Sequence, residues 1–196
     1  MAQRRSYTGL IVAAGIVVLL IIVVSWYAGT RNSLVRMEEQ VNAQWSEVEN
    51  QLKRRSDLIP NLVNTVKGFA AQEEEVFTSI ADARARLAGA QGVEETAESY
   101  GELQSALSRL LVVVENYPQL RSNENFIRLQ DELAGTENRI AVARRRYNEA
   151  VRSFNTRVRT FPTALIASSM GFEQKEYFEV PEEDMEVPEV QFESEE

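Results

Sequence analysis

The sequence contains neither cysteine nor histidine among its 196 residues. Without cysteine the chain can form no disulfide, no thiolate metal site, no thiol nucleophile and no lipid-modified cysteine. Without histidine it lacks the commonest general base and metal ligand of proteins. These two absences exclude many catalytic and metal-binding classes, but they are compatible with either side of a membrane.

Sequence motifs of catalysis are missing as well. The chain has no glycine-rich phosphate loop, no G-x-S-x-G elbow and no H-E-x-x-H helix. Carboxylates are the catalytic material that remains, for example Glu73, Glu74 and Glu75, or Glu137 and Glu149. Such groups on amphipathic helices usually lie on the solvated face. We therefore predict no enzymatic activity, no cofactor and no metal site.

Basic side chains are fewer than acidic ones, 21 against 30, so the formal net charge is −9. This excess is local: residues 173–196 hold eleven acidic side chains and one lysine, so the rest of the chain is close to neutral. A near-neutral domain with an acidic tail lacks the clustered cationic face that binds nucleic acid. We therefore expect no nucleic-acid partner.

The strongest positive feature is an uncharged run over residues 6–30, with Trp26 and Tyr27 near its end. A membrane-spanning helix needs about 17 to 25 apolar residues, and aromatic rings favour the headgroup layer. The run is longer than the core of a secretory signal, and no pair of small residues follows it in the A-x-A manner. We therefore predict a retained anchor over residues 1–30.

Charges around this run give a nearly balanced orientation signal. Arg4 and Arg5 precede it, and Arg31 and Arg36 follow it. The free N-terminal amine adds positive charge to the first side, and positive flanks stay in the cytoplasm. We expect a single-pass protein of the cell membrane with its domain on the extracytoplasmic side.

Residues 34–52 carry apolar side chains at spacings of three and four, which is typical of one helical face. The membrane helix is expected to continue into this segment with little or no hinge. Pro60 interrupts the pattern within Leu58, Ile59, Pro60 and Asn61, after which apolar residues resume the helical period as far as Leu87. Either one long helix bends near Leu58, or a second helix starts with Pro60 in its first turn.

Later segments are also helical by their spacing. Residues 88–99 contain two glycines and read as a loop, residues 100–116 form an amphipathic face, and a short connection leads to Asn123, a good N-cap. The next helix carries apolar or aromatic residues at one heptad position, as in a coiled coil. These heptad residues are Phe126, Leu133, Ile140, Tyr147 and Phe154. Residues 163–170 are predicted as two short turns closed by Gly171.

The predicted fold is all-α: one transmembrane helix, then an antiparallel up-and-down bundle of three to four helices over residues 31–172. Residues 173–196 are predicted to be a disordered acidic tail whose removal changes stability little. Arg144, Arg145 and Arg146 fan around a helix beside Tyr147, so most of this run is explained as solvated surface. Arg144, Arg145, Tyr147 and the segment around Pro60 remain the candidate interaction residues.

Taken together, the motifs resemble the LemA family of bacterial membrane proteins over about residues 10–178. The resemblance rests on these stretches: residues 32–35, 41–46, 51–63, 66–70, 115–120, 123–126, 129–133, 136–141, 143–148, 161–162 and 171–172. It implies one N-terminal span and a helical bundle, and it implies no known enzyme activity. The long acidic tail departs from the pattern.

We therefore predict a membrane-anchored interaction or scaffold protein of the bacterial envelope, which presents helical surface to protein partners or to copies of itself. The alternative is an envelope sensor or adhesin-like accessory that binds a ligand between its helices. A pocket of about 300 Å³ or more would favour that alternative.

Overall fold

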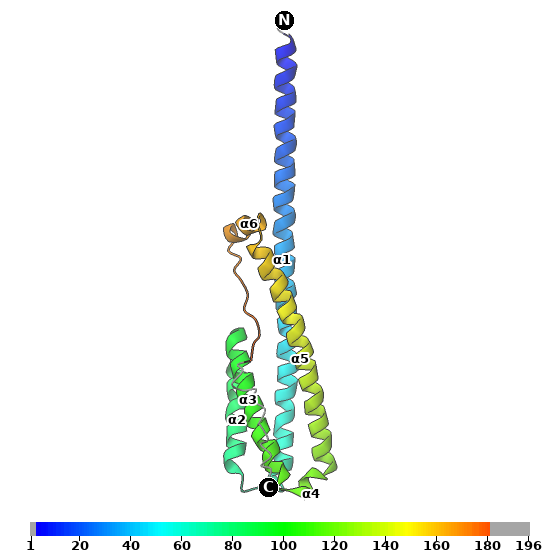
Figure 1. Ribbon diagram of the computed structural model, residues 1–196, viewed down its shortest axis with the longest axis vertical. Helices are drawn as coiled ribbons and strands as arrows, with labels where there is room; N and C mark the ends of the chain where they lie inside the picture. The colour runs from blue at the N-terminus through cyan, green and yellow to red at the C-terminus, as the bar shows by residue number, and fades with distance from the viewer. Residues whose placement is uncertain (1–2, 181–196) are drawn as a thin grey trace, which may run out of the picture. The chain divides into compact units, whose positions relative to one another are not determined.

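The computed structural model describes residues 3–180, with side chains from residue 9 onward. In this part of the chain every regular element is a helix, as the sequence predicts (Figure 1). The helices are α1 (Gln3–Lys67), α2 (Glu74–Gly89), α3 (Gly92–Glu115), α4 (Pro118–Arg121), α5 (Glu124–Arg159) and α6 (Thr163–Ser169). The chain divides into two compact units, one with residues up to Ala43 and Glu149–Lys175, the other with Gln44–Asn148 and residues from Glu176.

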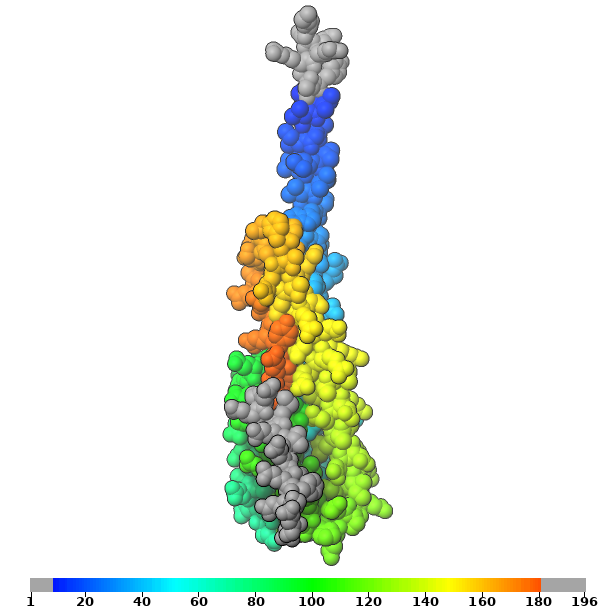
Figure 2. Space-filling model, viewed as in Figure 1, coloured from blue at the N-terminus to red at the C-terminus, as the bar shows by residue number. Residues whose placement is uncertain are grey.

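Helix α1 is a single element of 65 residues that begins before the apolar run and ends at Lys67. An 18-residue stretch of α1 has a mean hydropathy of 2.9, and no part of that stretch is buried by other described residues. Thr30, at the end of the run, is buried. Figure 2 shows the run without a covering segment on the viewed face. α1 is thus long and apolar enough to cross a membrane, and the expected continuation without a loop is confirmed.

Pro60 lies inside α1, so the alternative in which it starts a second helix is wrong. A proline ring removes the hydrogen bond to the carbonyl four residues earlier, here that of Ser56. Arg84 of α2 supplies the missing donor: its Nε lies 3.0 Å from the Ser56 carbonyl oxygen and 3.2 Å from the Ser56 hydroxyl. The helix continues because the carbonyl left free by proline has another partner.

The first unit is built where α6 meets α1. Leu34 of α1 is buried together with Ile166 and Ala167 of α6. Gly171 closes α6 with a φ of +73°, a backbone conformation that residues other than glycine rarely adopt. This confirms the predicted end of the segment. Lys175 then pairs with Glu38 of α1 at 2.7 Å.

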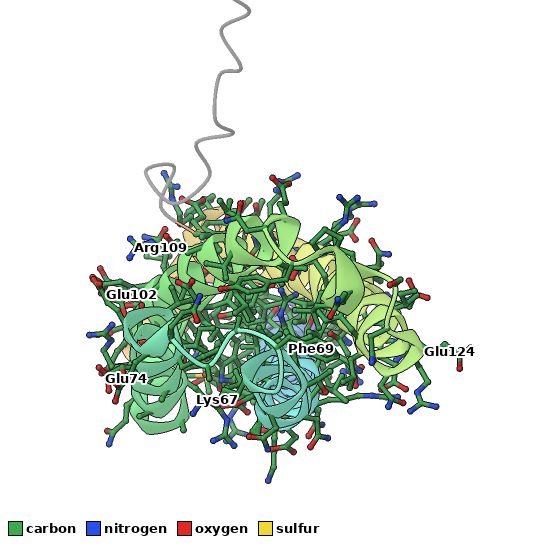
Figure 3. All side chains as sticks on the ribbon, turned by 90° about the horizontal axis from the view of Figure 1, so that it is seen from below. Lys67, Phe69, Glu74, Glu102, Arg109 and Glu124 are labelled. Carbon is green, nitrogen blue, oxygen red and sulfur yellow. The ribbon has the colours of Figure 1, made fainter. Side chains whose placement is uncertain are left out.

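The second unit contains the main hydrophobic core, to which α1, α2, α3, α4 and α5 all contribute. Its fully buried members include Val66, Leu103, Leu110 and Leu120. Charged side chains such as Glu74, Glu102 and Glu124 lie on the outside (Figure 3). The heptad residues Phe126, Leu133, Ile140, Tyr147 and Phe154 are all buried, which confirms the predicted face of α5.

Two boundaries differ from the sequence prediction. The helical period was expected to continue from Ile59 to Leu87, but α1 ends at Lys67 and α2 begins at Glu74. The backbone N–H groups of Phe69 and Ala70 both donate to the Val66 carbonyl, each at 2.9 Å, and so close the helix. Ala70 and Phe77 are buried in the same core. The apolar spacing therefore continues across the turn, and the turn could not be recognised from the sequence.

The predicted loop over residues 88–99 is wrong for most of its length. Only residues 90 and 91 separate α2 from α3. Gly92, with a φ of +80°, allows the tight connection, and Glu94 and Glu95 favour the positive end of α3. The connection after residue 118 also contains helix α4, with Pro118 at its start, and Asn123 caps α5 by accepting from the N–H of Phe126 at 3.1 Å.

The prediction of an unfolded tail is wrong for residues 173–180. These residues have no regular secondary structure, yet Phe178 is buried and its backbone is hydrogen-bonded to α5. The aromatic anchor outweighs the acidic composition of this short segment. The rest of the predicted tail lies outside the described residues.

Candidate functional site

The residues around Pro60 serve the core more than the surface. Ile59 is fully buried, and Leu58 packs against the same core while Asn61 is exposed. The Asn61 carbonyl accepts from the Thr65 hydroxyl at 2.9 Å. The structure therefore places this segment in the part of α1 that contributes to the core. Its effect on polar groups is that Pro60 leaves the Ser56 carbonyl free to accept from Arg84.

Of the other candidates, Tyr147 is buried, Arg144 is half-buried and Arg145 is exposed. Arg144 lies close enough to Tyr100 for its charge to favour the phenolate, which partly offsets the raised pKa of that tyrosine. The three predicted residues therefore do not form one cluster. Tyr147 alone belongs to the aromatic group described below.

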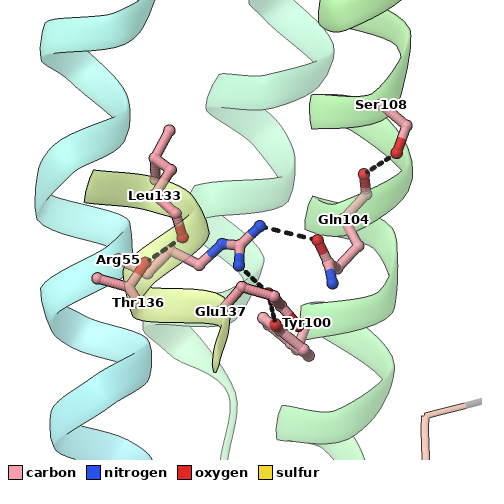
Figure 4. Close-up of polar contacts among 7 residues, drawn as sticks. All are labelled: Arg55, Tyr100, Gln104, Ser108, Leu133, Thr136 and Glu137. Carbon is pink, nitrogen blue, oxygen red and sulfur yellow. Dashed lines mark hydrogen bonds and ion pairs between the residues drawn. The ribbon is translucent and has the colours of Figure 1, made fainter. Parts of the chain in front are cut away.

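A polar cluster that the sequence analysis missed crosses the core of the second unit (Figure 4). Arg55 of α1 donates to Glu137 of α5, and its Nη2 donates to Gln104 of α3 at 2.8 Å. The hydroxyl of Tyr100, also on α3, donates to the same carboxylate. Three helices are thus joined through one buried guanidinium.

Burial controls the electrostatics of this cluster. Desolvation lowers the pKa of Arg55 and raises the pKa of Tyr100, and each group partly offsets the shift of the other. The Arg55 guanidinium also lies 5.8 Å from the centre of the Tyr100 ring. Arginine stays protonated at any ordinary pH, so the cluster holds a permanent cation that needs its partners.

One donor of this cation has no partner within the described residues, namely Nε of Arg55, although the residue is only 6% exposed. Arg55, Gln130 and Glu137 line a cavity of about 220 Å³ whose other walls are apolar. Those walls are Leu62, Leu107, Leu111, Leu133 and Ala134. The cavity offers an apolar body and a few polar groups, but it is small.

A second feature is the seat of Phe178, the residue that ties the extended segment to the second unit. Its ring lies 5.9 Å from that of Trp45 and 6.3 Å from that of Tyr100. Trp45 in turn packs on Tyr147 at 5.2 Å. Aromatic rings at such separations attract each other beyond the effect of buried area. Phe178 therefore acts as an anchor in an aromatic seat.

Side chains of α5 hold the backbone around this anchor. Asn148 Oδ1 accepts from the N–H of Phe178 at 2.9 Å, and Asn148 Nδ2 donates to the Phe178 carbonyl at 3.1 Å. The hydroxyl of Tyr147 donates to the Glu176 carbonyl at 2.9 Å. Burial, with the nearby Glu176 charge, raises the pKa of Tyr147 to about 12, so this hydroxyl remains a donor at neutral pH.

The first unit contains a second asparagine of α5 that forms the same pair of hydrogen bonds with a backbone residue. Asn155 accepts from the N–H of Lys175 and donates to its carbonyl, both at 2.8 Å. Within each unit, an asparagine of α5 therefore holds the backbone of the extended segment through a pair of hydrogen bonds.

Sequence signals for these residues existed but were weak. Arg55 follows Leu52 by three residues and precedes Ile59 by four, which places it on the buried face. Asn148 and Asn155 each follow a heptad residue directly. Arg55 was not singled out from the sequence, because it follows two other charged residues, Lys53 and Arg54. No His, Cys, Asp or Glu group suited to a metal ion is found among the described side chains.

Replacing Arg84 should show how the Pro60 carbonyl is satisfied. In the native chain Arg84→Met leaves the Ser56 carbonyl without its donor, which should cost about 1–3 kcal/mol of unfolding free energy. In a Pro60→Ala background the new N–H can serve that carbonyl, so the same change should cost clearly less. Denaturant unfolding of the four chains measures this difference, and Arg86→Met is the exposed control on the same helix. Equal costs in both backgrounds would refute the link between proline and arginine.

Removing the aromatic anchor should destabilise the domain, contrary to the expectation for a free tail. Phe178→Ala empties a buried seat and should cost about 3–5 kcal/mol, the range for buried phenylalanine. Tyr177→Ala, at a neighbouring side chain that is 37% exposed, should cost less than about 0.5 kcal/mol. Thermal and denaturant melts compare the two. Similar small costs for both would mean that the segment contributes nothing to folding.

Comparisons with known proteins bear on the chain as a whole. The model of the LemA family matches residues 44–192. The chain is 28% identical over 174 residues to Magnetosome protein MamQ 2 of Paramagnetospirillum magneticum, covering 76% of this chain and 64% of that protein. It is 26% identical over 173 residues to Magnetosome protein MamQ of Magnetospirillum gryphiswaldense, covering 75% and 64%.

A shorter match is 25% identical over 116 residues to Protein LemA of Metamycoplasma hominis, covering 58% of this chain and 52% of that protein. The matches thus span less than two thirds of the length of these relatives. The relatives and the apolar part of α1 together indicate a membrane-associated helical protein. Because the family match extends over most of the sequence, the chain belongs to the LemA family.

Proposed function

We propose that this chain is a membrane-anchored interaction protein of the bacterial envelope, and that it joins copies of itself at the membrane surface. In this proposal α1 crosses the membrane once and the remaining helices form an up-and-down bundle on the extracytoplasmic side. The chain acts as a scaffold without catalytic activity, cofactor or nucleic-acid partner.

The observation that carries the proposal is the way in which the segment around Phe178 is held. Asn148 and Tyr147 form hydrogen bonds with backbone atoms of that segment, and the Phe178 ring fills the aromatic seat. Backbone hydrogen bonds with a single side-chain anchor are a common mode of recognition for extended peptides. The seat is therefore suited to the same segment from a second copy.

Repulsion between carboxylates favours release of the segment, residues 173–180, from the seat in its own chain. Glu94 and Glu98 of α3 line an open groove of about 540 Å³ together with Glu176, Tyr177 and Glu179 of the segment. Carboxylates that face each other oppose the aromatic and backbone contacts, because like charges repel at short range. A segment held against repulsion exchanges more readily than one held by complementary charge.

Anchoring increases the chance of exchange between copies. Two copies inserted in one membrane keep their segments and seats at similar heights, so the effective concentration of one for the other is high. Exchange of an identical element between copies needs no new surface, because the contacts already exist within one chain. Self-association through residues 173–180 is therefore the form of scaffolding that we propose.

A complementation experiment with full-length chains tests this proposal. The Asn148→Ala chain has a damaged seat and an intact segment, while the Phe178→Ala chain has an intact seat and a damaged segment. We expect either chain alone to self-associate poorly. Mixed in mild detergent under two affinity tags, they should be isolated together several-fold more than either with itself, because the mixture restores one intact pairing.

The control pair is Asn50→Ala with Gln119→Ala, two exposed positions outside the segment and its seat that should behave like the native chain. Phe178→Leu is a milder replacement that keeps the domain folded if alanine does not, with folding checked by circular dichroism. Co-isolation of the mixture at the level of the single variants would contradict exchange. Strong association of both single variants would place self-association on another surface.

The second candidate function, ligand binding between helices, rests on the cavity beside Arg55. The orphaned Nε would meet a hydrogen-bond acceptor, and the leucine walls would meet an apolar body. Its volume of about 220 Å³ is below the range of about 300–1,000 Å³ usual for ligand pockets. The larger groove beside Glu94 is open and acidic, so it gives this candidate less support.

A further inference from the structure

The turn between α5 and α6 exposes large apolar side chains outside the apolar run of α1. Phe161 is 77% exposed and Leu165 is 64% exposed. Phe161 is the most exposed large apolar side chain of the part that the structure describes, the apolar run of α1 included. Two such side chains close together in the sequence make this turn a candidate contact with another apolar surface or a membrane.

The packing of α6 fixes where this turn lies along α1. Ile166 and Ala167 are buried against Leu34, which is four residues beyond Thr30 at the end of the apolar run. Four residues of helix rise about 6 Å. The headgroup region of a bilayer is about 5–7 Å thick on each side of the hydrocarbon core. If α1 spans the membrane, α6 therefore lies at the level of the headgroups. Figure 1 shows α6 beside α1.

The charges near the turn are of one sign. Arg157 and Arg159 end α5, and Arg31 and Arg36 follow the apolar run on α1. No acidic residue occurs between residues 150 and 172 or between residues 28 and 37, although the chain as a whole is strongly acidic. An anionic bilayer surface attracts nearby arginine side chains. The local charge therefore matches anionic lipid headgroups.

We propose that the turn between α5 and α6 is a second membrane contact, in which Phe161 and Leu165 enter the headgroup layer and Arg157 and Arg159 meet anionic lipid. An apolar side chain flanked by arginine is the composition of interfacial membrane segments. The contact would fix the tilt and rotation of α1 relative to the bilayer, because it adds a point of attachment beside the span. This inference rests on the proposed membrane anchoring of α1.

The absence of cysteine allows a direct test in full-length chains. Single replacements Phe161→Cys and Leu165→Cys carry an environment-sensitive fluorophore in vesicles of phosphatidylcholine and phosphatidylglycerol that contain nitroxide-labelled lipid. Val18→Cys reports on the span. Val112→Cys is the matched control, an apolar side chain of α3 that is 62% exposed.

Labels at residues 161 and 165 should shift to shorter emission wavelength and be quenched several-fold more than the label at residue 112. The difference should shrink in vesicles of phosphatidylcholine alone, and equal quenching in both lipids would overturn the role of the arginines. If the label at residue 18 is quenched but the labels at residues 161 and 165 are quenched no more than the label at residue 112, the second contact is overturned and the anchor is left intact. An unquenched label at residue 18 would instead overturn the anchoring itself, and with it this inference.

Discussion

Continuity of α1 is the constraint on which the rest of the structure depends. One helix meets two surroundings: its apolar run has an 18-residue stretch that nothing in the described chain covers, and its last third contributes to the hydrophobic core. No loop separates these two parts of α1 within the described residues. The contact of α6 with Leu34 and the seat of Phe178 beside Trp45 both follow from their places along this helix.

Backbone groups in unusual positions account for the other specific contacts. Pro60 frees the Ser56 carbonyl, and Arg84 uses that carbonyl to join α2 to α1. Asn148 supplies the hydrogen bonds that the irregular backbone at Phe178 would otherwise lack. A buried backbone group without a partner costs about as much as a lost hydrogen bond. These contacts therefore select one arrangement among the many that a helical hydrophobic pattern allows.

Periodicity predicted the helices well and their ends poorly. The heptad from Phe126 to Phe154 was found from the sequence because burial of one face repeats with the helix. The end of α1 was missed because Ala70 and Phe77 stay in phase across the turn. Arg55 and Phe178 were missed for a different reason. Composition describes only the residues next to them in the sequence, whereas their contacts are with residues far away in the sequence. The candidate site could be found only from contacts between distant parts of the chain.

The central claim, that α1 joins the apolar run to the core without a hinge, can be measured most directly by hydrogen exchange of the full-length chain in lipid nanodiscs. Stable helical hydrogen bonds slow the exchange of backbone amides, and local opening accelerates it. The account predicts slow exchange without interruption from residue 20 to residue 50. Fast exchange confined to residues 28–33, between two protected stretches, would show a hinge and contradict it.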